Sequence, residues 1–361
     1  EVAEALVSAG AKALVASKGG RLEDELAKVG GELIRIDNLP TKNPLAIHAN
    51  AGVLAKLAQD RNVSLIHARS RAPAWSALWA ARRTKLPFVT TYHGVYNAKS
   101  SLKRLYNSVM ARGDAVIANS DFTAAHVIAE HPAAKDRLVT IHRGVDIAKF
   151  SADAISPERK AALAAAWNLP PDGAPLILLP ARLTGWKGHR EAIAAAAQLK
   201  RDGSANWRMV FAGDHQGRDA YKAELSQLIG SAGLDGQVLM VGHCADMPAA
   251  LALAAIVIAP SNEQEAFGRV AAEAGAMGVP AVGSSIGAQK EIVVDGETGL
   301  IVPPSSPQAL AAAIANLLDR GPEGRRIMGE AARTRVLARF TTSALQKATL
   351  SVYERLIGRN P

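Results

Sequence analysis

The stretch Pro260-Ser261-Asn262-Glu263-Gln264-Glu265-Ala266-Phe267-Gly268-Arg269-Val270-Ala271-Ala272-Glu273-Ala274-Gly275 decides the fold of this chain. An apolar run from Ala255 to Ala259 precedes it and predicts a buried strand that ends at Pro260. The polar residues after Pro260 predict a loop, and the alanine-rich segment after Gly268 predicts a helix that ends before Gly278. A strand, a loop and a helix in this order are typical of an α/β protein.

Two glutamates with seven residues between them bracket the predicted corner between loop and helix. Glu265 lies in the loop near the helix N-terminus, where unpaired N–H groups and the helix dipole favour an anion. Glu273 lies about two turns into the helix, where a carboxylate is costly unless a donor such as a sugar hydroxyl binds it. The pattern favours a site for a phosphorylated sugar. The alternative is that both are solvated surface carboxylates, which is common for glutamate.

The composition indicates two domains of a water-soluble α/β class. The chain has 361 residues, of which 48% are hydrophobic, and apolar strands alternate with alanine-rich helices. Its longest apolar run, from Ala249 to Ala259, is too short to span a bilayer. The single cysteine, Cys244, excludes an internal disulfide, and no Cys or His pair has the spacing of a metal site.

Positive charge is concentrated in the first half of the chain. Residues 1–150 carry 21 Lys and Arg against 13 Asp and Glu, a net charge of +8, whereas residues 151–361 carry 21 against 20. This positive charge has three interpretations: a solvated face, a nucleic-acid surface, or a surface for anionic lipid headgroups. No nucleic-acid recognition module is present, so lipid is favoured over nucleic acid. The densest basic residues are Arg82, Arg83, Lys85, Lys99, Lys103, Arg104 and Arg112.

Polar residues follow several predicted strands, at the edge where open α/β sheets bind ligands. His67 and Arg69 lie at the end of the strand predicted over 63–68, and His93 ends the next one before Gly94. His93 can equally be a histidine that is hydrogen-bonded at a strand end. Asn119 and Ser120 follow a third strand, where helix capping by Ser120 or Asp121 is the alternative role.

In the second half, a loop after the strand over 175–180 carries Arg182 and Lys187 just before a predicted helix. A guanidinium grips phosphate oxygens in a planar fork, and an ammonium supplies a compact charge near the helix N-terminus. Taken alone, both are usually surface charges. A later strand ends at Gly242 and is followed by His243 and Asp246, and Asp246 is also a candidate helix cap.

Together these motifs resemble the retaining glycosyltransferases of family 4, with their Glu-x7-Glu signature and an upstream Arg-Leu-x3-Lys-Gly motif. The resemblance covers almost the whole chain and implies the GT-B fold: two Rossmann-like domains with parallel sheets facing a central cleft, and a C-terminal helix that crosses back to the first domain. It implies an N-terminal acceptor domain over 1–150 completed by 341–361, a linker over 151–172 and a nucleotide-sugar donor domain over 173–340. In the family a first strand and a glycine-rich loop precede the helix that opens this sequence.

The resemblance also implies a role for each motif residue. Glu265 and His93 would be catalytic, next to the transferred sugar. Arg182, Lys187 and the N–H groups near Phe267 and Gly268 would bind the diphosphate, and Glu273 the ribose. The remaining expected site residues are Gly242, His243 and Asp246 near the base, and Tyr92, Asn119, Ser120 and Arg143 on the acceptor side, Arg143 standing where Asn is more usual.

The implied reaction moves a hexose-type sugar from a nucleotide diphosphate sugar, with UDP, GDP or another base, to a glycan or glycolipid, with retention and without metal or cofactor. The basic first half favours bacterial envelope or lipopolysaccharide synthesis at an anionic membrane surface, hence a cytoplasmic, peripheral location and no nucleic-acid partner. The alternatives are a sugar-nucleotide epimerase or phosphorylase of the same architecture, and a non-catalytic nucleotide-binding or membrane-docking module.

Overall fold

A computed structural model of the chain describes residues 1–96, 100–204 and 206–358. Contacts between residues divide it into two units: Glu1–Arg143 with Thr342–Pro361, and Gly144–Thr341. The segment 151–172, expected as a linker, is part of the second unit, because Ile155 and Trp167 are buried in a cluster with Leu178 of that unit. Lys99 of the basic cluster lies outside the described residues.

The first unit is built on short parallel strands. Strands β3, β4, β5 and β6 form one sheet in that order, and β1 pairs with β2 in a separate two-stranded sheet. The elements of this unit are α1 (Val2–Ser8), β1 (Leu14–Ser17), α2 (Glu23–Lys28), β2 (Glu32–Arg35), α3 (Pro44–Asp60), β3 (Ile66–Ala68), α4 (Arg71–Thr84), β4 (Phe88–Tyr92), α5 (Ser101–Asn107), η1 (Ser108–Ala111), β5 (Ala115–Ala118), α6 (Asp121–Glu130), η2 (Pro132–Arg137), β6 (Leu138–Thr140) and α15 (Thr342–Ile357).

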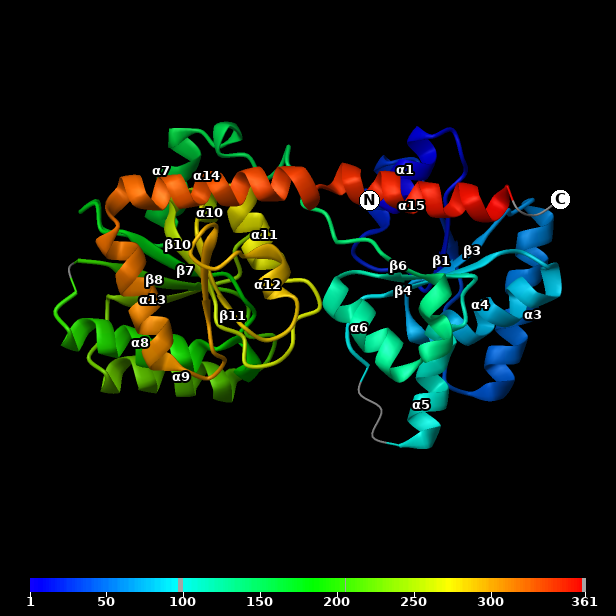
Figure 1. Cartoon of the computed structure of the whole chain (residues 1–361), viewed down its shortest axis with the longest axis horizontal. Helices are drawn as coiled ribbons and strands as arrows, with labels where there is room; N and C mark the ends of the chain where they lie inside the picture. Colours follow the sequence, from blue (N-terminus) through cyan, green and yellow to red (C-terminus); the bar gives the residue numbers. More distant parts are fainter. Residues whose placement is uncertain (97–99, 205, 359–361) are drawn as a thin grey trace. The chain divides into compact units, whose positions relative to one another are not determined.

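Both faces of the β3–β6 sheet are buried, and the last helix covers one of them. Val89 and Ile117 pack with Val352 and Tyr353 of α15, whereas Phe88 and Val116 pack on the other face. Helix α15 also lies beside α1, as the red and blue helices of Figure 1 show. The predicted return of the C-terminal helix to the first domain is therefore confirmed.

The second unit contains one six-stranded parallel sheet in the order β12-β11-β10-β7-β8-β9. Its elements are η3 (Ala152–Ala154), α7 (Pro157–Ala166), β7 (Leu176–Leu179), η4 (Gly185–Lys187), α8 (His189–Arg201), β8 (Arg208–Ala212), α9 (Asp219–Ser231), β9 (Val238–Gly242), α10 (Met247–Leu253), β10 (Ala254–Ala259), α11 (Arg269–Ala276), β11 (Ala281–Ser284), α12 (Gln289–Ile292), β12 (Gly299–Val302), α13 (Pro307–Asp319) and α14 (Gly321–Arg339).

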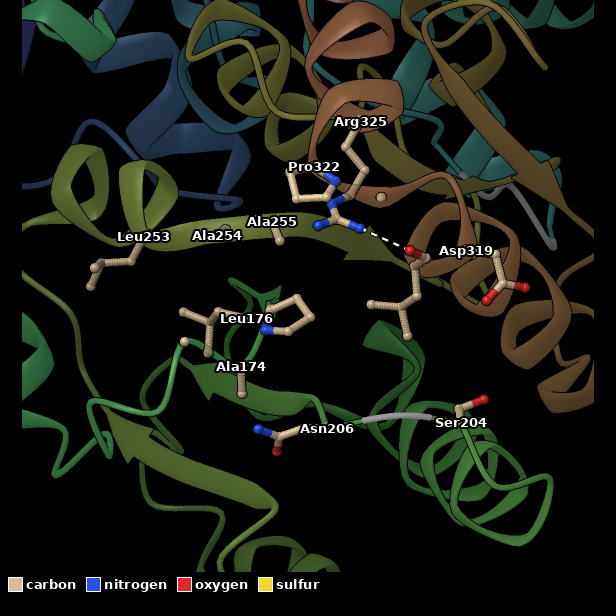
Figure 2. Close-up of a pocket in the computed structure, with 14 residues that line it drawn as sticks. Ala174, Leu176, Ser204, Asn206, Leu253, Ala254, Ala255, Asp319, Pro322 and Arg325 are labelled. Atoms are coloured by element: carbon tan, nitrogen blue, oxygen red, sulfur yellow. Dashed lines mark hydrogen bonds between the residues drawn. The ribbon is translucent and has the colours of Figure 1, made fainter.

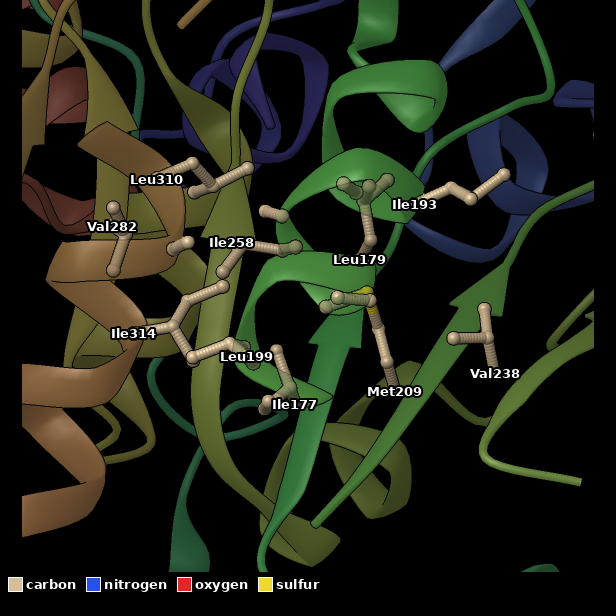
Figure 3. Close-up of a cluster of buried hydrophobic side chains, with 14 of the residues drawn as sticks. Ile177, Leu179, Ile193, Leu199, Met209, Val238, Ile258, Val282, Leu310 and Ile314 are labelled. Atoms are coloured by element: carbon tan, nitrogen blue, oxygen red, sulfur yellow. The ribbon is translucent and has the colours of Figure 1, made fainter. Parts of the chain in front are cut away.

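Helices cover both faces of this sheet, so its strands are apolar on both sides. Ile177 and Leu179 of β7 pack against α8 and α13 in the cluster drawn in Figure 3. Leu176 and Leu178 point to the other face and pack with α10 and α11. The predicted α/β class with two Rossmann-like, parallel-sheet domains is confirmed. Among the helices of the described residues, none is long and apolar enough to cross a bilayer.

Candidate functional site

Two loops of the second unit bring a cation and a carboxylate together. Lys187 follows β7 and Glu265 follows β10, and these two strands are neighbours in the sheet. The Nζ atom of Lys187 lies 2.6 Å from Oε1 of Glu265, and the two side chains are 15% and 10% exposed. The hydroxyl of Ser261 donates to the same carboxylate oxygen. The two predicted site residues thus form one nearly buried ion pair.

Two glycines allow the chain to approach Glu265 this closely. Gly188 has φ +79°, and a Cβ there would lie 2.1 Å from the carbonyl oxygen of Pro260. Gly287 has φ +75°, and a Cβ there would lie 2.5 Å from the carbonyl oxygen of Glu265. Both positions combine a left-handed backbone with no room for a side chain, and only glycine meets both conditions without strain. The main chain of Glu265 also accepts a hydrogen bond from Ala288 N at 2.8 Å.

Helix α11 begins directly after this loop at Gly268, which has φ +61°. No side chain of the described residues caps the helix, so its first N–H groups are left for solvent or a ligand. Phe267 is 4% exposed and packs edge-on against Phe340, with 5.9 Å between ring centroids. Its ring is therefore part of the core, and only its main chain can serve the expected diphosphate contact.

Glu273 lies on α11 and is paired within the helix. Its Oε1 accepts from Nε of Arg269 at 2.7 Å, and the side chains of Glu273 and Arg269 are 13% and 56% exposed. A ribose contact by Glu273 remains a prediction.

Gln289, which no sequence motif singles out, is fully buried beside Gly268. Its amide donates to Ala259 O at 3.1 Å and accepts from Ser284 N at 3.0 Å, so it joins the ends of β10 and β11. In the sequence, Gln289 is a single amide residue after a predicted strand, and such residues are too common to indicate a structural role.

Arg182 lies on the same loop as Lys187 but is exposed to solvent. Its Nη1 donates to Gln216 Oε1 at 3.3 Å, and Leu183 N donates to Asp214 O at 3.0 Å. This part of the loop therefore lies beside the segment that comes after β8. Among the contacts given by the described residues, none joins Arg182 to Lys187 or Glu265. The structure places Arg182 near the carboxyl end of the sheet without bringing it into the ion pair.

The three residues expected near the base have different surroundings. Gly242 ends β9 with φ +74°, and His243 is exposed. Asp246 caps α10 by accepting from Ala249 N at 3.1 Å, as its alternative role predicted. Its carboxylate also binds Arg159 of α7 at 2.5 and 2.6 Å, and this guanidinium lowers the pKa of Asp246. Both carboxylate oxygens are therefore occupied by structural contacts.

In the first unit, a small pocket lies where β3, β4, β5 and β6 end. Each strand or strand exit contributes a pair of residues two positions apart, which is the spacing of one sheet face. The pairs are His67 and Arg69, Thr91 and His93, Ile117 and Asn119, and Ile141 and Arg143. Glu1 and Val2, at the start of the chain, and Leu345 and Thr349 of α15 complete the lining.

His67 connects this pocket to the last helix. One ring nitrogen lies 2.5 Å from the hydroxyl of Tyr353 on α15, and the other lies 2.7 Å from the hydroxyl of Thr91. Burial is the main reason that the pKa of His67 is lowered to about 3, with the charge of Arg69 as a second cause. A neutral His67 therefore has a structural role, holding α15 against the sheet.

Nδ1 of His93 and the amide of Asn119 are buried polar groups of the pocket that have no partner among the described residues. Burial, and then the charges of Arg69 and Arg143, lower the pKa of His93 to about 4, so its ring is neutral near pH 7. Its Nδ1 is buried with no hydrogen-bond partner among the described residues. Asn119 is 2% exposed, and within the described part of the chain neither its Oδ1 nor its Nδ2 has a partner.

Tyr92 and Ser120, also expected on the acceptor side, do not line this pocket. Tyr92 is 1% exposed in the core on the opposite face of β4, because neighbouring residues of a strand point to opposite faces. Ser120 is fully buried and caps α6 by accepting from Thr123 N at 3.0 Å, which confirms the capping alternative. The structure thus groups Asn119 and Arg143 with His93 and adds Arg69, to which no role was assigned from the sequence.

A larger pocket lies at the opposite edge of the sheet of the second unit (Figure 2). Leu176 and Ala254, which begin β7 and β10, are part of its lining. Arg325 stands over it, but Nη1 of its guanidinium donates to the carbonyls of Leu317 and Leu318 at 3.0 and 3.1 Å. Ligands of open α/β sheets gather at the carboxyl ends of strands, so this pocket is not the candidate site.

Comparison with known proteins supports a common family for both units. Residues 165–335 match the model of Glycosyl transferases group 1, and residues 1–149 match that of Glycosyltransferase Family 4. The D-inositol 3-phosphate glycosyltransferase of Kineococcus radiotolerans is 30% identical over 332 residues, which are 82% of this chain and 73% of that protein. The alpha-D-kanosaminyltransferase of Streptomyces kanamyceticus is 32% identical over 206 residues, 56% of this chain and 51% of that one. The crystal structure of a glycosyltransferase from Rickettsia africae ESF-5 has a TM-score of 0.93 at 32% identity and covers 100% of this chain and 94% of its own.

Proposed function

Because the chain belongs to glycosyltransferase family 4 and is a glycosyltransferase, we propose that it transfers a hexose-type sugar from a nucleotide diphosphate sugar to a glycan or glycolipid acceptor. The contact between Lys187 and Glu265 carries the donor part of this proposal. It joins a cation and a carboxylate from two neighbouring strand ends, next to the uncapped N-terminus of α11. Diphosphate suits the cation and the N–H groups, and sugar hydroxyls suit the carboxylate.

The ion pair suggests how donor binding prepares the site. A diphosphate carries more negative charge than one carboxylate, so it competes with Glu265 for Lys187. Glu265 is then released to accept hydrogen bonds from the hydroxyls of the sugar and to orient it. As the anomeric bond breaks, Lys187, Arg182 and the first N–H groups of α11 stabilise the charge that develops on the leaving diphosphate. In this proposal His93 contacts the hexose as a neutral hydrogen-bonding group, because its pKa is lowered to about 4.

We propose retention at the anomeric carbon, with no metal and no cofactor besides the nucleotide sugar. The support for metal independence is that Arg182 and Lys187 supply positive charge in the loop of the donor site. Glu265 is not proposed as a covalent nucleophile, because in this proposal its carboxylate accepts hydrogen bonds from the hydroxyls of the sugar. Retention therefore rests on the family resemblance, in which the leaving phosphate accepts the proton of the acceptor. The anomeric configuration of the product, followed by NMR in the presence of EDTA, tests both points.

Nucleotide binding is the first test. UDP, GDP, ADP and TDP are titrated by calorimetry into the intact chain and into Lys187→Ala and Glu273→Ala, with Lys222→Ala of the exposed face of α9 as the control. Charge-assisted hydrogen bonds contribute about 1.5–3 kcal/mol, so we expect Lys187→Ala to weaken one nucleotide about 10- to 150-fold. The control should stay within about twofold, since surface charges contribute little. If the intact chain binds none of the four nucleotides, the proposal fails and a non-catalytic docking module takes its place.

We place the acceptor at an anionic membrane surface, in bacterial envelope or lipopolysaccharide synthesis. The supporting feature is α5, where Leu102 and Leu105 are 78% and 55% exposed beside Lys103 and Arg104. Exposed apolar side chains next to basic ones are typical of helices that bind the headgroup region of anionic membranes. The relatives that act on D-inositol 3-phosphate suggest the competing acceptor, a small phosphorylated polyol.

Sedimentation with vesicles of phosphatidylglycerol or phosphatidylcholine tests the membrane surface. Each buried Leu side chain contributes about 1.5–3 kcal/mol, so Leu102→Gln together with Leu105→Gln should weaken binding to phosphatidylglycerol at least about tenfold. Leu45→Gln is the matched control, because Leu45 is 81% exposed on α3 of the same unit. Equal binding by both variants, or no preference for anionic vesicles, would contradict the membrane proposal.

A further inference from the structure

The pocket of the first unit carries an excess of positive charge. Arg69 and Arg143 line this pocket together with His93, and the charges of both arginines lower the pKa of His93. The one carboxylate among the lining residues is Glu1. Arg69 is exposed at the end of β3, so its guanidinium can reach a group that enters from solvent.

The pocket also contains polar atoms that await a partner. The amide of Asn119 is almost completely buried, and in the described part of the chain neither of its two polar atoms is hydrogen-bonded. His93 Nδ1 is in the same condition. A buried polar group without a partner is costly, and folded proteins keep few of them. Binding of a polar ligand is one reason why a folded protein retains buried polar groups without partners.

We propose that this pocket binds an anionic group, phosphate or carboxylate, of the acceptor molecule. The proposal rests on the glycosyltransferase function given above and adds the charge of the second substrate. Arginine guanidiniums bind oxyanions with paired hydrogen bonds, and the Asn119 amide supplies a neutral donor beside them. The pocket is small, so only the anionic group contacts it and the rest of the acceptor stays outside.

The donor diphosphate is the competing source of such an anion. The second unit already has its own groups for a diphosphate, namely Arg182, Lys187 and the N-terminus of α11. Neither Arg69 nor Arg143 belongs to a motif that the family resemblance assigns to the donor. His93 of this pocket is assigned to the hexose of the donor, which carries no charge, so the acceptor is the source that we propose for the anionic group.

Binding of inorganic phosphate to the full chain tests the site without any turnover. NMR of the histidine rings follows His93, whose signal is assigned with His93→Gln. Bound phosphate brings negative charge against Arg69, Arg143, His67 and Glu1, the charged or titratable groups that line the pocket, so we expect it to raise the pKa of His93. Arg69→Gln and Arg143→Gln should each weaken phosphate binding about tenfold or more. Arg82→Gln, an exposed arginine of α4, should leave it unchanged.

Asn119→Leu separates a ligand site from a packing defect. The leucine removes the unpartnered amide at similar volume, so thermal stability should stay or rise while phosphate affinity falls. Lower stability with unchanged phosphate affinity would assign Asn119 a structural role and overturn the proposal. A sugar phosphate should bind more tightly than the corresponding neutral sugar, and only in chains that keep both arginines.

Three further outcomes overturn the inference. Phosphate binding that persists in the double variant Arg69→Gln, Arg143→Gln means that the anion binds elsewhere. Equal loss of nucleotide diphosphate affinity in that double variant means that the pocket serves the donor. No phosphate binding by an intact chain that binds a nucleotide refutes the inference alone, whereas phosphate binding without any nucleotide binding refutes the proposed donor function instead.

Discussion

In the second unit, Lys187 and both glutamates of the Glu-x7-Glu pair are held in ion pairs, whereas in the first unit's pocket Asn119 and one ring nitrogen of His93 lack a partner among the described residues. Lys187 holds Glu265, and Arg269 holds Glu273. In the pocket of the first unit, Asn119 and His93 Nδ1 have no hydrogen bond among the described residues. A paired site is stable without ligand and exchanges one partner for another. An unpaired site is destabilised until its ligand binds, so it depends more strongly on the identity of that ligand.

Lowering the pH should reveal the largest difference in stability between the two units. The pKa values of His67 and His93 in the first unit are lowered to about 3 and 4, and that of His189 in the second unit to about 4. The unfolded chain takes up these protons near pH 6.5 and the folded chain does not, so stability is fully present above pH 6.5 and is lost as the pH falls toward 4. Each group loses about 1.4 kcal/mol per pH unit, or roughly 2–3 kcal/mol by pH 4.5.

Hydrogen exchange at pH 7.0, 5.5 and 4.5 measures the loss of stability in β4 and β5 of the first unit and in β7 and β8 of the second. Each unit is thus measured by itself, and the chain is not assumed to unfold in a single transition. The first unit should lose more than the second, because burial also lowers the pKa values of its His126 and His131. His67→Gln should reduce the pH dependence in the first unit only. An equal loss of stability per pH unit in both units would contradict the expected difference between them.

Glu265→Gln tests whether the carboxylate of Glu265 binds Lys187 until a diphosphate displaces it. The glutamine keeps the size but loses the charge, so turnover should fall at least about 100-fold, the scale of a misplaced substrate. Nucleotide diphosphate affinity should stay or rise, because Lys187 loses a competing carboxylate. Kinetics and calorimetry give the two values, and Glu263→Gln, an exposed residue of the same loop, is the control. Nucleotide affinity that falls together with turnover would show that Glu265 supports Lys187 rather than competes for it.

Gly188→Ala tests how much of the paired site depends on close backbone approach. Gly188 and Gly236 have φ +79° and +74°, but a Cβ at Gly236 meets nothing within 4 Å. Both substitutions should therefore cost about 1–2 kcal/mol for the left-handed backbone, and Gly188→Ala more because of Pro260. Denaturant unfolding measures the difference. A Gly188→Ala chain as stable as Gly236→Ala would mean that the two loops move apart easily.

Asp246→Asn should have the smallest effect. Asparagine also caps helices well, so only the ion pair with Arg159 is lost, and both of these side chains are partly exposed. The free energy of unfolding should fall by less than about 1 kcal/mol. Nucleotide affinity should not change, since the carboxylate is engaged by Arg159 and Ala249. A clear loss of affinity would restore the original expectation that Asp246 contacts the base.

The sequence was sufficient where the pattern is local. Apolar segments located the strands, and the polar residues after Pro260 with the alanine-rich segment after Gly268 located a loop followed by a helix. It was insufficient where the partner is remote: nothing near Glu265 shows that Lys187, far earlier in the chain, lies 2.6 Å away. Tyr92 was misplaced for a related reason, because a one-residue step along a strand changes the face of the sheet. Gln289 was missed because burial, which makes its amide structural, is set by the whole fold.

The hydrogen bond between His67 and Tyr353 has a consequence for the order in which the chain folds during synthesis. The face of β4 and β5 that carries Val89 and Ile117 is covered by α15, which is translated after the whole second unit. The first unit is therefore completed only after the second unit has been made, and until then its sheet keeps an apolar face exposed. Such a face is a site for chaperones on the nascent chain, and a chain that ends before Thr342 would carry it permanently.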